Sequence, residues 1–129
     1  MIEQKRILAT SIPGPASQAL QQRKVAAVAA GVSTGLPVYV TEASGGILRD
    51  ADGNQLIDFG SGIAVTTVGN GNQRIIDAVT EQITAFTHTC FMVTPYDSYV
   101  QVCEKLNELT PGDHEKRSAL FNTGAEAVE

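Results

Sequence analysis

Apolar positions along the chain change their spacing several times, and each spacing predicts a different element. Two stretches repeat apolar residues about every three or four positions, as on one buried face of a helix. The first runs from Gln73 to about Phe86 behind Asn72, a good N-cap, and its stripe is Ile75, Ile76, Val79, Ile83 and Phe86. The second opens at Thr94-Pro95 and ends at Pro111-Gly112, with a stripe of Val100, Cys103, Leu106 and Leu109.

Other stretches lack this spacing. Residues 1–16 contain prolines and serines without periodicity, and predict a flexible N-terminal arm. The next residues, from Ser17 to about Ala30, are rich in Ala, Gln, Lys and Arg and predict a helix that stops at Gly31.

Between Leu36 and Phe59 the apolar residues gather in short runs, as in strands. Two small-residue breaks separate the runs, Ser44-Gly45-Gly46 and the stretch from Asp50 to Asn54. Because Asp-Gly between apolar runs is a strong hairpin signal, the segment predicts a three-stranded antiparallel meander. Such a sheet is marginal alone and needs an element packed on one face.

The last twelve residues, from Ser118, read as a short strand, a tight turn at Gly124 and the start of a helix. A strand-turn-helix with small residues directs backbone N–H groups and a positive helix end toward one point, which suits a phosphate. A tight turn without a ligand is the plainer alternative. The whole order of elements predicts a mixed α/β fold.

Composition narrows the class of protein. The 129 residues carry a net charge of −5, with scattered basic residues, which disfavours a nucleic-acid surface. No apolar stretch approaches the roughly 20 residues of a membrane span, and no secretory signal opens the chain, so we expect a cytoplasmic protein. Asp50, Asp52 and Asp58 lack the calcium-loop pattern, and Cys90 and Cys103 lack a metal-pair spacing, so no metal site is expected.

Four short motifs occur in a fixed order downstream of the predicted hairpin. They are Gly60-Ser61-Gly62-Ile63-Ala64-Val65, His88-Thr89-Cys90-Phe91, Pro111-Gly112-Asp113 and Thr123-Gly124-Ala125-Glu126-Ala127-Val128-Glu129. With the hairpin Asp52-Gly53-Asn54-Gln55-Leu56-Ile57-Asp58-Phe59, the chain from Gly35 onward resembles the start of class III aminotransferases that depend on pyridoxal phosphate. Within this family it looks most like bacterial members that act on 4-aminobutyrate.

The resemblance implies the N-terminal part of a fold-type I transferase. Residues 17–60 would belong to its small domain, and residues 61–129 would begin the large domain that binds pyridoxal 5'-phosphate. Family members are typically homodimers. Their reaction moves the amino group of an ω-amino acid such as 4-aminobutyrate to 2-oxoglutarate, while the cofactor provides the electron sink.

The resemblance also assigns site residues. Thr123, Gly124 and Ala125 match the segment that binds the cofactor phosphate, although many relatives carry Ser at the position of Ala125. Ile63 matches a position that lines the substrate pocket, and from the residues alone it could equally pack in a core. The Schiff-base lysine of the family lies beyond Glu129, and Lys105 and Lys116 do not match it. No catalytic residue is therefore assigned, and the 129 residues alone are expected to be inactive and to fold poorly.

Two alternatives stay open. The chain could begin another class III ω-aminotransferase, acting on ornithine, acetylornithine, 5-aminovalerate or a diamine, because the residues that select the substrate lie downstream. It could also be a non-catalytic module that binds a phosphorylated ligand or a full-length subunit.

Overall fold

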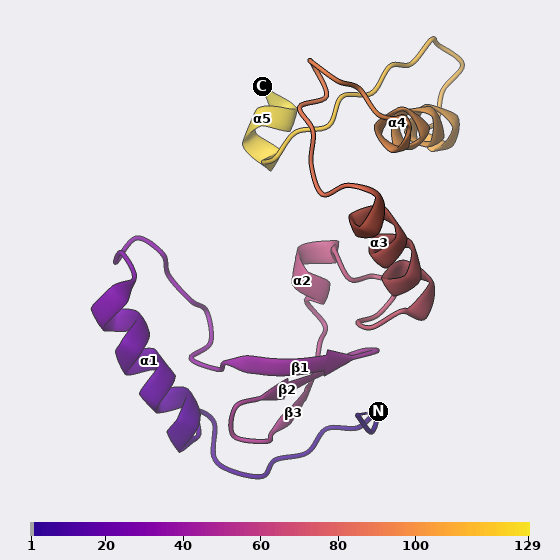
Figure 1. Cartoon of the computed structure of the whole chain (residues 1–129). Helices are drawn as coiled ribbons and strands as arrows, with labels where there is room; N and C mark the ends of the chain where they lie inside the picture. The colour runs from indigo at the N-terminus through magenta and orange to yellow at the C-terminus, as the bar shows by residue number, and fades with distance from the viewer. Residues whose placement is uncertain (1) are drawn as a thin grey trace. The chain divides into compact units, whose positions relative to one another are not determined.

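The computed structural model describes residues 2–129, which divide into two compact units. One unit extends to Glu81 and the other begins at Gln82. Figure 1 shows the elements in chain order. They are α1 (Pro15–Ala27), β1 (Val40–Ser44), β2 (Ile47–Asp50), β3 (Gln55–Ile57), α2 (Ser61–Ala64), α3 (Gln73–Ala85), α4 (Asp97–Leu109) and α5 (Gly124–Val128). The mixed α/β class is confirmed.

Helix α1 is confirmed, with shifted ends. Pro15 occupies the first turn, where its missing N–H costs no helical hydrogen bond. The side chain of Asp52 replaces an N-cap, because its carboxylate accepts hydrogen bonds from the N–H groups of Ala16 at 2.6 Å and Ser17 at 2.9 Å. The predicted stop at Gly31 is wrong, since the chain turns extended at Val28.

The three predicted strands form one antiparallel sheet in the order β1-β2-β3. Leu48 pairs with Ala43 on one side and with Leu56 on the other. The turn between β2 and β3 depends on Gly53, whose φ of +84° favours glycine, and on the Asp50 carboxylate, which accepts hydrogen bonds from two backbone N–H groups of the turn. The Asp-Gly signal therefore predicted this hairpin correctly.

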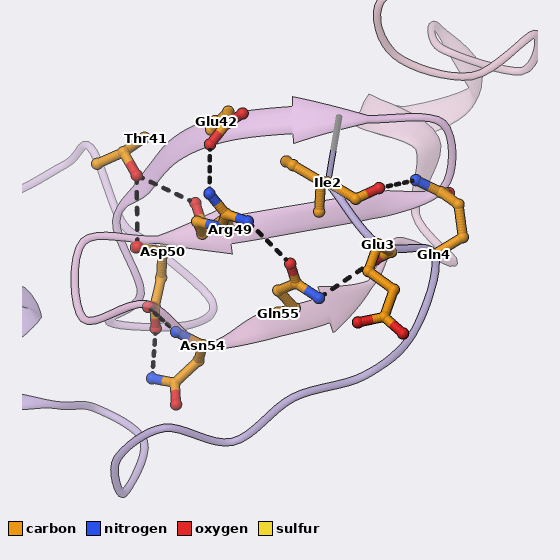
Figure 2. A network of polar contacts seen from close by, with 9 residues as sticks. All are labelled: Ile2, Glu3, Gln4, Thr41, Glu42, Arg49, Asp50, Asn54 and Gln55. Atoms are coloured by element: carbon orange, nitrogen blue, oxygen red, sulfur yellow. Dashed lines mark hydrogen bonds and ion pairs between the residues drawn. The ribbon is translucent and has the colours of Figure 1, made fainter.

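The segment predicted as a flexible arm carries hydrogen bonds to the sheet. Ile7 exchanges two backbone hydrogen bonds with Gln55, at 3.0 and 2.8 Å. The side chain of Gln55 also donates to the carbonyls of Glu3 and Lys5. Figure 2 shows Glu3 and Gln4 beside the hairpin that carries Gln55. The N-terminal segment is thus hydrogen-bonded to the start of β3, although its composition indicated no strand.

The interior of the first unit is mostly polar. Within residues 2–129, the buried apolar side chains are Ile2 and Ile47. Four polar residues are buried to the same degree, namely Ser17, Asp50, Asn54 and Gln55. The side chains of Asp50, Asn54 and Gln55 have hydrogen-bond partners, whereas the Oγ of Ser17 has none within the described residues. Since a buried polar group without a partner is costly, the partners of Asn54 and Gln55 in the N-terminal segment decide how that segment and the sheet fit together.

Helix α3 begins as predicted, because the Asn72 side chain accepts a hydrogen bond from the N–H of Arg74 at 3.1 Å. Its apolar stripe is not buried within residues 2–129: the exposed fractions of Ile75, Ile76, Val79 and Ile83 lie between 45% and 57%. The spacing thus places the apolar residues on one face of α3 as predicted, and that face stays about half exposed among the described residues. None of the helices among residues 2–129 is long and apolar enough to span a membrane.

The second unit is organised around four aromatic rings, which we call the aromatic cluster: Phe86, Phe91, Tyr96 and Tyr99. Phe91 stacks on Tyr99 with ring centroids 4.2 Å apart and meets Tyr96 edge-on at 5.4 Å. Tyr96 is the N-cap residue of α4 and makes no side-chain cap, so the predicted start at Thr94-Pro95 is wrong. The cluster holds the start of α4 against the preceding link.

The strand predicted after Ser118 does not form within the described residues. A strand needs a neighbouring strand to receive its backbone hydrogen bonds, and among the described residues of the second unit there is no strand. Instead, the N–H of Leu120 donates to the hydroxyl of Tyr99 at 3.0 Å, and the Ser118 hydroxyl pairs with Asn107 at 2.8 Å. Side chains of α4 thus hold the segment that leads to α5.

Candidate functional site

The start of α5 keeps part of the arrangement predicted for an anion site, namely the turn into the helix without the preceding strand. Thr123 is extended, with φ of −137°, and its hydroxyl oxygen accepts a hydrogen bond from the N–H of Glu126 at 3.2 Å. The first N–H groups of a helix have no partner inside the helix. Within residues 2–129, no hydrogen bond satisfies the N–H groups of Gly124 or Ala125. Two free donors therefore lie at the start of α5.

The space beside the Cα of Gly124 is open. A Cβ atom built on Gly124 would meet no atom within 4 Å. The donors and the open space fit a phosphate group, which accepts several hydrogen bonds and is attracted to a positive helix end. The residues matched to the phosphate of pyridoxal phosphate, Thr123, Gly124 and Ala125, therefore suit that group. They do so with two backbone donors and one hydroxyl.

One acidic group lies at the same end of α5. The Thr123 hydroxyl is 3.1 Å from the Glu126 carboxylate, so its hydrogen is directed to Glu126. A bound phosphate would compete with this carboxylate for the same hydroxyl. The hydroxyl would have to turn away from Glu126 in order to donate to the phosphate.

Ile63 lies in the first unit, on a loop whose two ends are hydrogen-bonded to the turn between β1 and β2. We call residues 58–70 the anchored loop. At its start, the N–H of Asp58 donates to the carbonyl of Gly46 at 2.9 Å. At its end, Asn70 exchanges two backbone hydrogen bonds with Gly45, both 2.8 Å long. A surface loop with such closely held ends is an Ω-loop, a form that often carries function.

The side chain of Ile63 projects from the anchored loop into solvent, with 95% of its surface exposed. It belongs to α2, a single turn in which all four residues have positive φ: 47° for Ser61, 60° for Gly62 and Ile63, and 63° for Ala64. For three non-glycine residues this backbone is unfavourable by roughly 1 kcal/mol each, so surrounding hydrogen bonds have to stabilise it. Within the described residues, Ile63 is therefore not a core residue.

Two hydrogen bonds at the start of α2 are accepted by Asp58, for which the sequence favoured turn chemistry over a calcium loop without assigning it a role at the site. The Asp58 carboxylate accepts hydrogen bonds from the N–H groups of Gly60 at 3.0 Å and Ser61 at 2.8 Å. The signal that could have found Asp58 is its position directly after a strand and before Gly60, where an Asp side chain often accepts from backbone N–H groups two residues on.

The side chain of Asp52 has the one shifted acidity resolved among residues 2–129. Burial acts to raise its pKa, but contact with the Ser17 side chain and hydrogen bonds from the N–H groups of Ser17 and Ala16 together hold the pKa below its ordinary value. The carboxylate caps α1, so this shift describes a structural contact rather than an acid or base.

The two lysines considered above make local contacts. Lys105 pairs with Glu108 at 2.7 Å on the exposed side of α4, and Lys116 donates to the carbonyl of Gly112. Within residues 2–129, no cluster of three or more His, Cys, Asp or Glu side chains could hold a metal ion. Among the described residues, the candidate features are therefore the backbone donors that follow Thr123 and the exposed apolar side chain of Ile63.

Comparison with known proteins places this geometry in a family. The family model for aminotransferase class III matches residues 27–129. Over 128 residues the chain is 63% identical to the 4-aminobutyrate aminotransferase of Mycobacterium tuberculosis, covering 99% of this chain and 28% of that protein. It is 46% identical over 113 residues to a 5-aminovalerate aminotransferase of Pseudomonas putida, covering 88% of this chain and 27% of that protein.

Solved structures show the same fold. The crystal structure of an acetylornithine aminotransferase from Elizabethkingia anophelis superposes with a TM-score of 0.74 at 23% sequence identity, covering 89% of this chain and 29% of that one. An ornithine δ-aminotransferase from Plasmodium falciparum gives 0.71, also at 23% identity, covering 88% of this chain and 28% of that one. The chain thus spans a little over a quarter of the length of the proteins that it matches.

Proposed function

The chain belongs to the class III aminotransferase family, and we propose that the complete gene product moves the amino group of 4-aminobutyrate to 2-oxoglutarate. The observation that carries this proposal is the 63% identity with a 4-aminobutyrate aminotransferase across nearly all of the chain. Pyridoxal 5'-phosphate, when bound, supplies the electron sink of the reaction. We further propose that the complete protein is a cytoplasmic homodimer, in which residues 17–60 belong to a small domain and residues 61–129 begin a large one.

In this proposal, the turn at Thr123 holds the cofactor phosphate. The N–H groups of Gly124 and Ala125 donate to phosphate oxygens, and the positive end of the helix that begins there favours the negative charge. These donors are fixed by the backbone, so they bind and orient the cofactor without taking part in proton transfer. Support comes from their lack of partners within residues 2–129.

Ile63 is proposed to form an apolar wall against the methylene stem of the amino donor. Its exposure of 95% leaves the side chain available for such a contact. An apolar contact of this kind distinguishes chain lengths modestly, by about tenfold or somewhat more per methylene group.

A second donor, 5-aminovalerate, is favoured by the 46% identical relative from Pseudomonas putida. The test is to purify the complete gene product and to measure kcat/KM for both donors with 2-oxoglutarate, following glutamate formation. A higher value for 4-aminobutyrate supports the leading proposal. A higher value for 5-aminovalerate makes that compound the proposed amino donor in place of 4-aminobutyrate. If neither donor yields glutamate, both proposed substrates are refuted.

A variant tests the phosphate-binding turn separately from turnover. Ala125→Pro removes one backbone N–H at a position in the first turn of α5, where proline is tolerated. We expect weaker cofactor binding in a titration that follows cofactor absorbance. Ala127→Gly is the control, because it leaves both backbone donors in place, and it is expected to bind the cofactor as the parent does. Equal affinity in the parent and in Ala125→Pro would contradict this role.

A further inference from the structure

The position of Ile63 depends on how the anchored loop is held to the sheet. Both ends of this loop meet one place, the Gly45-Gly46 turn, where Asp58 and Asn70 make backbone hydrogen bonds of 2.8 to 2.9 Å. These contacts fix where the loop begins and ends. They do not by themselves determine the shape of the residues between, since a loop of this length has many conformations available.

The shape between the ends is unfavourable for most of its residues. Ser61, Ile63 and Ala64 all have positive φ, a region that side chains rarely occupy. Four internal hydrogen bonds close the turn. The N–H groups of Ile63 and Ala64 donate to the carbonyl of Gly60 at 2.8 and 3.3 Å, and those of Val65 and Thr66 donate to the carbonyl of Ser61 at 2.8 and 2.9 Å. The strain of these residues opposes the turn, and a change to ordinary negative φ would alter the direction of the Ile63 side chain, so a contact that supports the turn also supports that direction.

Asp58 supplies that support from outside the turn. Its backbone N–H is bound to the sheet at Gly46, while its carboxylate accepts hydrogen bonds from the N–H groups of Gly60 and Ser61. One residue therefore joins the sheet to the first two residues of the strained stretch. The hydrogen bonds to a carboxylate are stronger than those to a neutral acceptor, which suits a group that holds an unfavourable backbone.

We propose that Asp58 is a positioning residue for substrate selection, which acts by holding the left-handed turn that presents Ile63 to the amino donor. The inference rests on the proposed function, because it takes Ile63 as a wall of the donor pocket. Asp58 itself touches neither the donor nor the cofactor in this proposal. Its contribution is to the geometry of the apolar wall and so to the discrimination between donors of different length.

The experiment uses the complete gene product and two variants of the same position. Asp58→Asn retains a side-chain oxygen that accepts from both N–H groups, whereas Asp58→Ala removes it. Asp113→Ala is the matched control, because Asp113 is an exposed aspartate of the second unit whose side chain makes no hydrogen bond or ion pair within residues 2–129. For each protein, kcat and KM are measured with 4-aminobutyrate and with 5-aminovalerate, and deuterium uptake is followed in peptides that cover the anchored loop.

We expect Asp58→Ala to change the ratio of kcat/KM for the two donors by roughly tenfold, mainly through KM, because the wall contributes binding along the methylene stem. The loop should take up deuterium faster in this variant. Asp113→Ala should resemble the parent in both measurements, and Asp58→Asn, which keeps a weaker neutral acceptor, should change them much less than Asp58→Ala does. An unchanged donor ratio in Asp58→Ala, or an equal change in Asp58→Asn, overturns the proposal.

A double-mutant cycle distinguishes an effect through Ile63 from a general weakening of the loop. If Asp58 acts through Ile63, then adding Asp58→Ala to Ile63→Ala changes the donor ratio little further. Additive effects overturn the proposal. If the protein transaminates neither donor, the proposed function fails, and the role of Asp58 in substrate selection falls with it. Deuterium uptake would then still show whether Asp58 holds the loop, so the two failures are distinguishable.

Discussion

The buried side chain of Asn54 offers the sharpest test of how the N-terminal segment is held to the sheet. Its Oδ1 accepts hydrogen bonds from the N–H groups of Ala9 and Thr10, each 2.9 Å long, and its Nδ2 donates to the Thr10 hydroxyl at 3.0 Å and to the Asp50 carboxylate at 2.8 Å. Asn54 has no exposed surface and Asp50 only 2%. Figure 2 shows the amide of Asn54 facing Asp50. The perturbation is Asn54→Asp, which keeps the acceptor and removes the donor.

The size of the effect follows from this geometry. The substitution places a second carboxylate where an amide now donates to Asp50 across 2.8 Å. Two carboxylates this close cannot both be charged, so one pKa rises by roughly 2 to 3 units. At about 1.36 kcal/mol per unit, the cost near neutral pH is about 3 kcal/mol. If releasing the N-terminal segment costs less than that, the segment detaches and limits the loss.

The sign with pH is fixed by the raised pKa. A group whose pKa is higher in the folded than in the unfolded protein is stabilising below the unfolded value of about 3.9, and this contribution is lost as the pH rises through the folded value. The deficit of the variant should therefore be small in acid and grow toward neutral pH. Parent and variant of the complete protein are compared by thermal unfolding, and by deuterium uptake at the amides of Ala9 and Thr10, across this range.

Asn72→Asp is the matched control, because a carboxylate still accepts the hydrogen bond that caps α3. It should leave stability nearly unchanged at neutral pH. A deficit of Asn54→Asp that is the same in acid and at neutral pH would refute the reasoning. So would amides of Ala9 and Thr10 that stay as protected as in the parent while the protein is destabilised elsewhere.

Three further predictions concern single contacts. Gly45→Ala should lower the free energy of unfolding, measured with urea, by about 1 to 2 kcal/mol, because φ at Gly45 is +55° and an added Cβ would lie 2.5 Å from Oε1 of Gln4. Gly46→Ala is the control and should lower it less, since no atom lies within 4 Å of the added Cβ. Equal losses in the two variants would contradict this account. Ala125→Ser should tighten cofactor binding by roughly fivefold, since a hydroxyl donor contributes of order 1 kcal/mol, and titration showing weaker binding would oppose the proposed phosphate contact. The pKa of Asp52 is lowered on folding, so its carboxylate should stabilise the protein fully above pH 3.8 and progressively less as the pH falls below that value. The difference in unfolding free energy between the parent and Asp52→Asn should therefore narrow in acid, and a difference that widens in acid would show the opposite sign.

Much of the local structure could be predicted because its causes lie close together in the sequence. The apolar period of α3 and its cap at Asn72 lie within one helix, and the Asp-Gly pair lies within one hairpin. The start of α5 was predicted correctly for the same reason, since Thr123 and Glu126 satisfy each other within one helical turn. In each case the hydrogen bonds that form the element join residues only a few positions apart.

The tertiary structure decided what depends on distant partners. Asn54 and Gln55 bind backbone groups of the N-terminal segment more than 40 positions away, so composition alone suggested a flexible arm there. The loop that carries Ile63 is closed by backbone hydrogen bonds of Asp58 and Asn70 to Gly45-Gly46, and no local preference indicates that closure. The strand predicted after Ser118 failed for the converse reason: its apolar residues favour a strand, but a strand forms only where a neighbour accepts its hydrogen bonds. Periodicity and turn chemistry therefore determined the elements, while pairing across the chain determined how the candidate site is held.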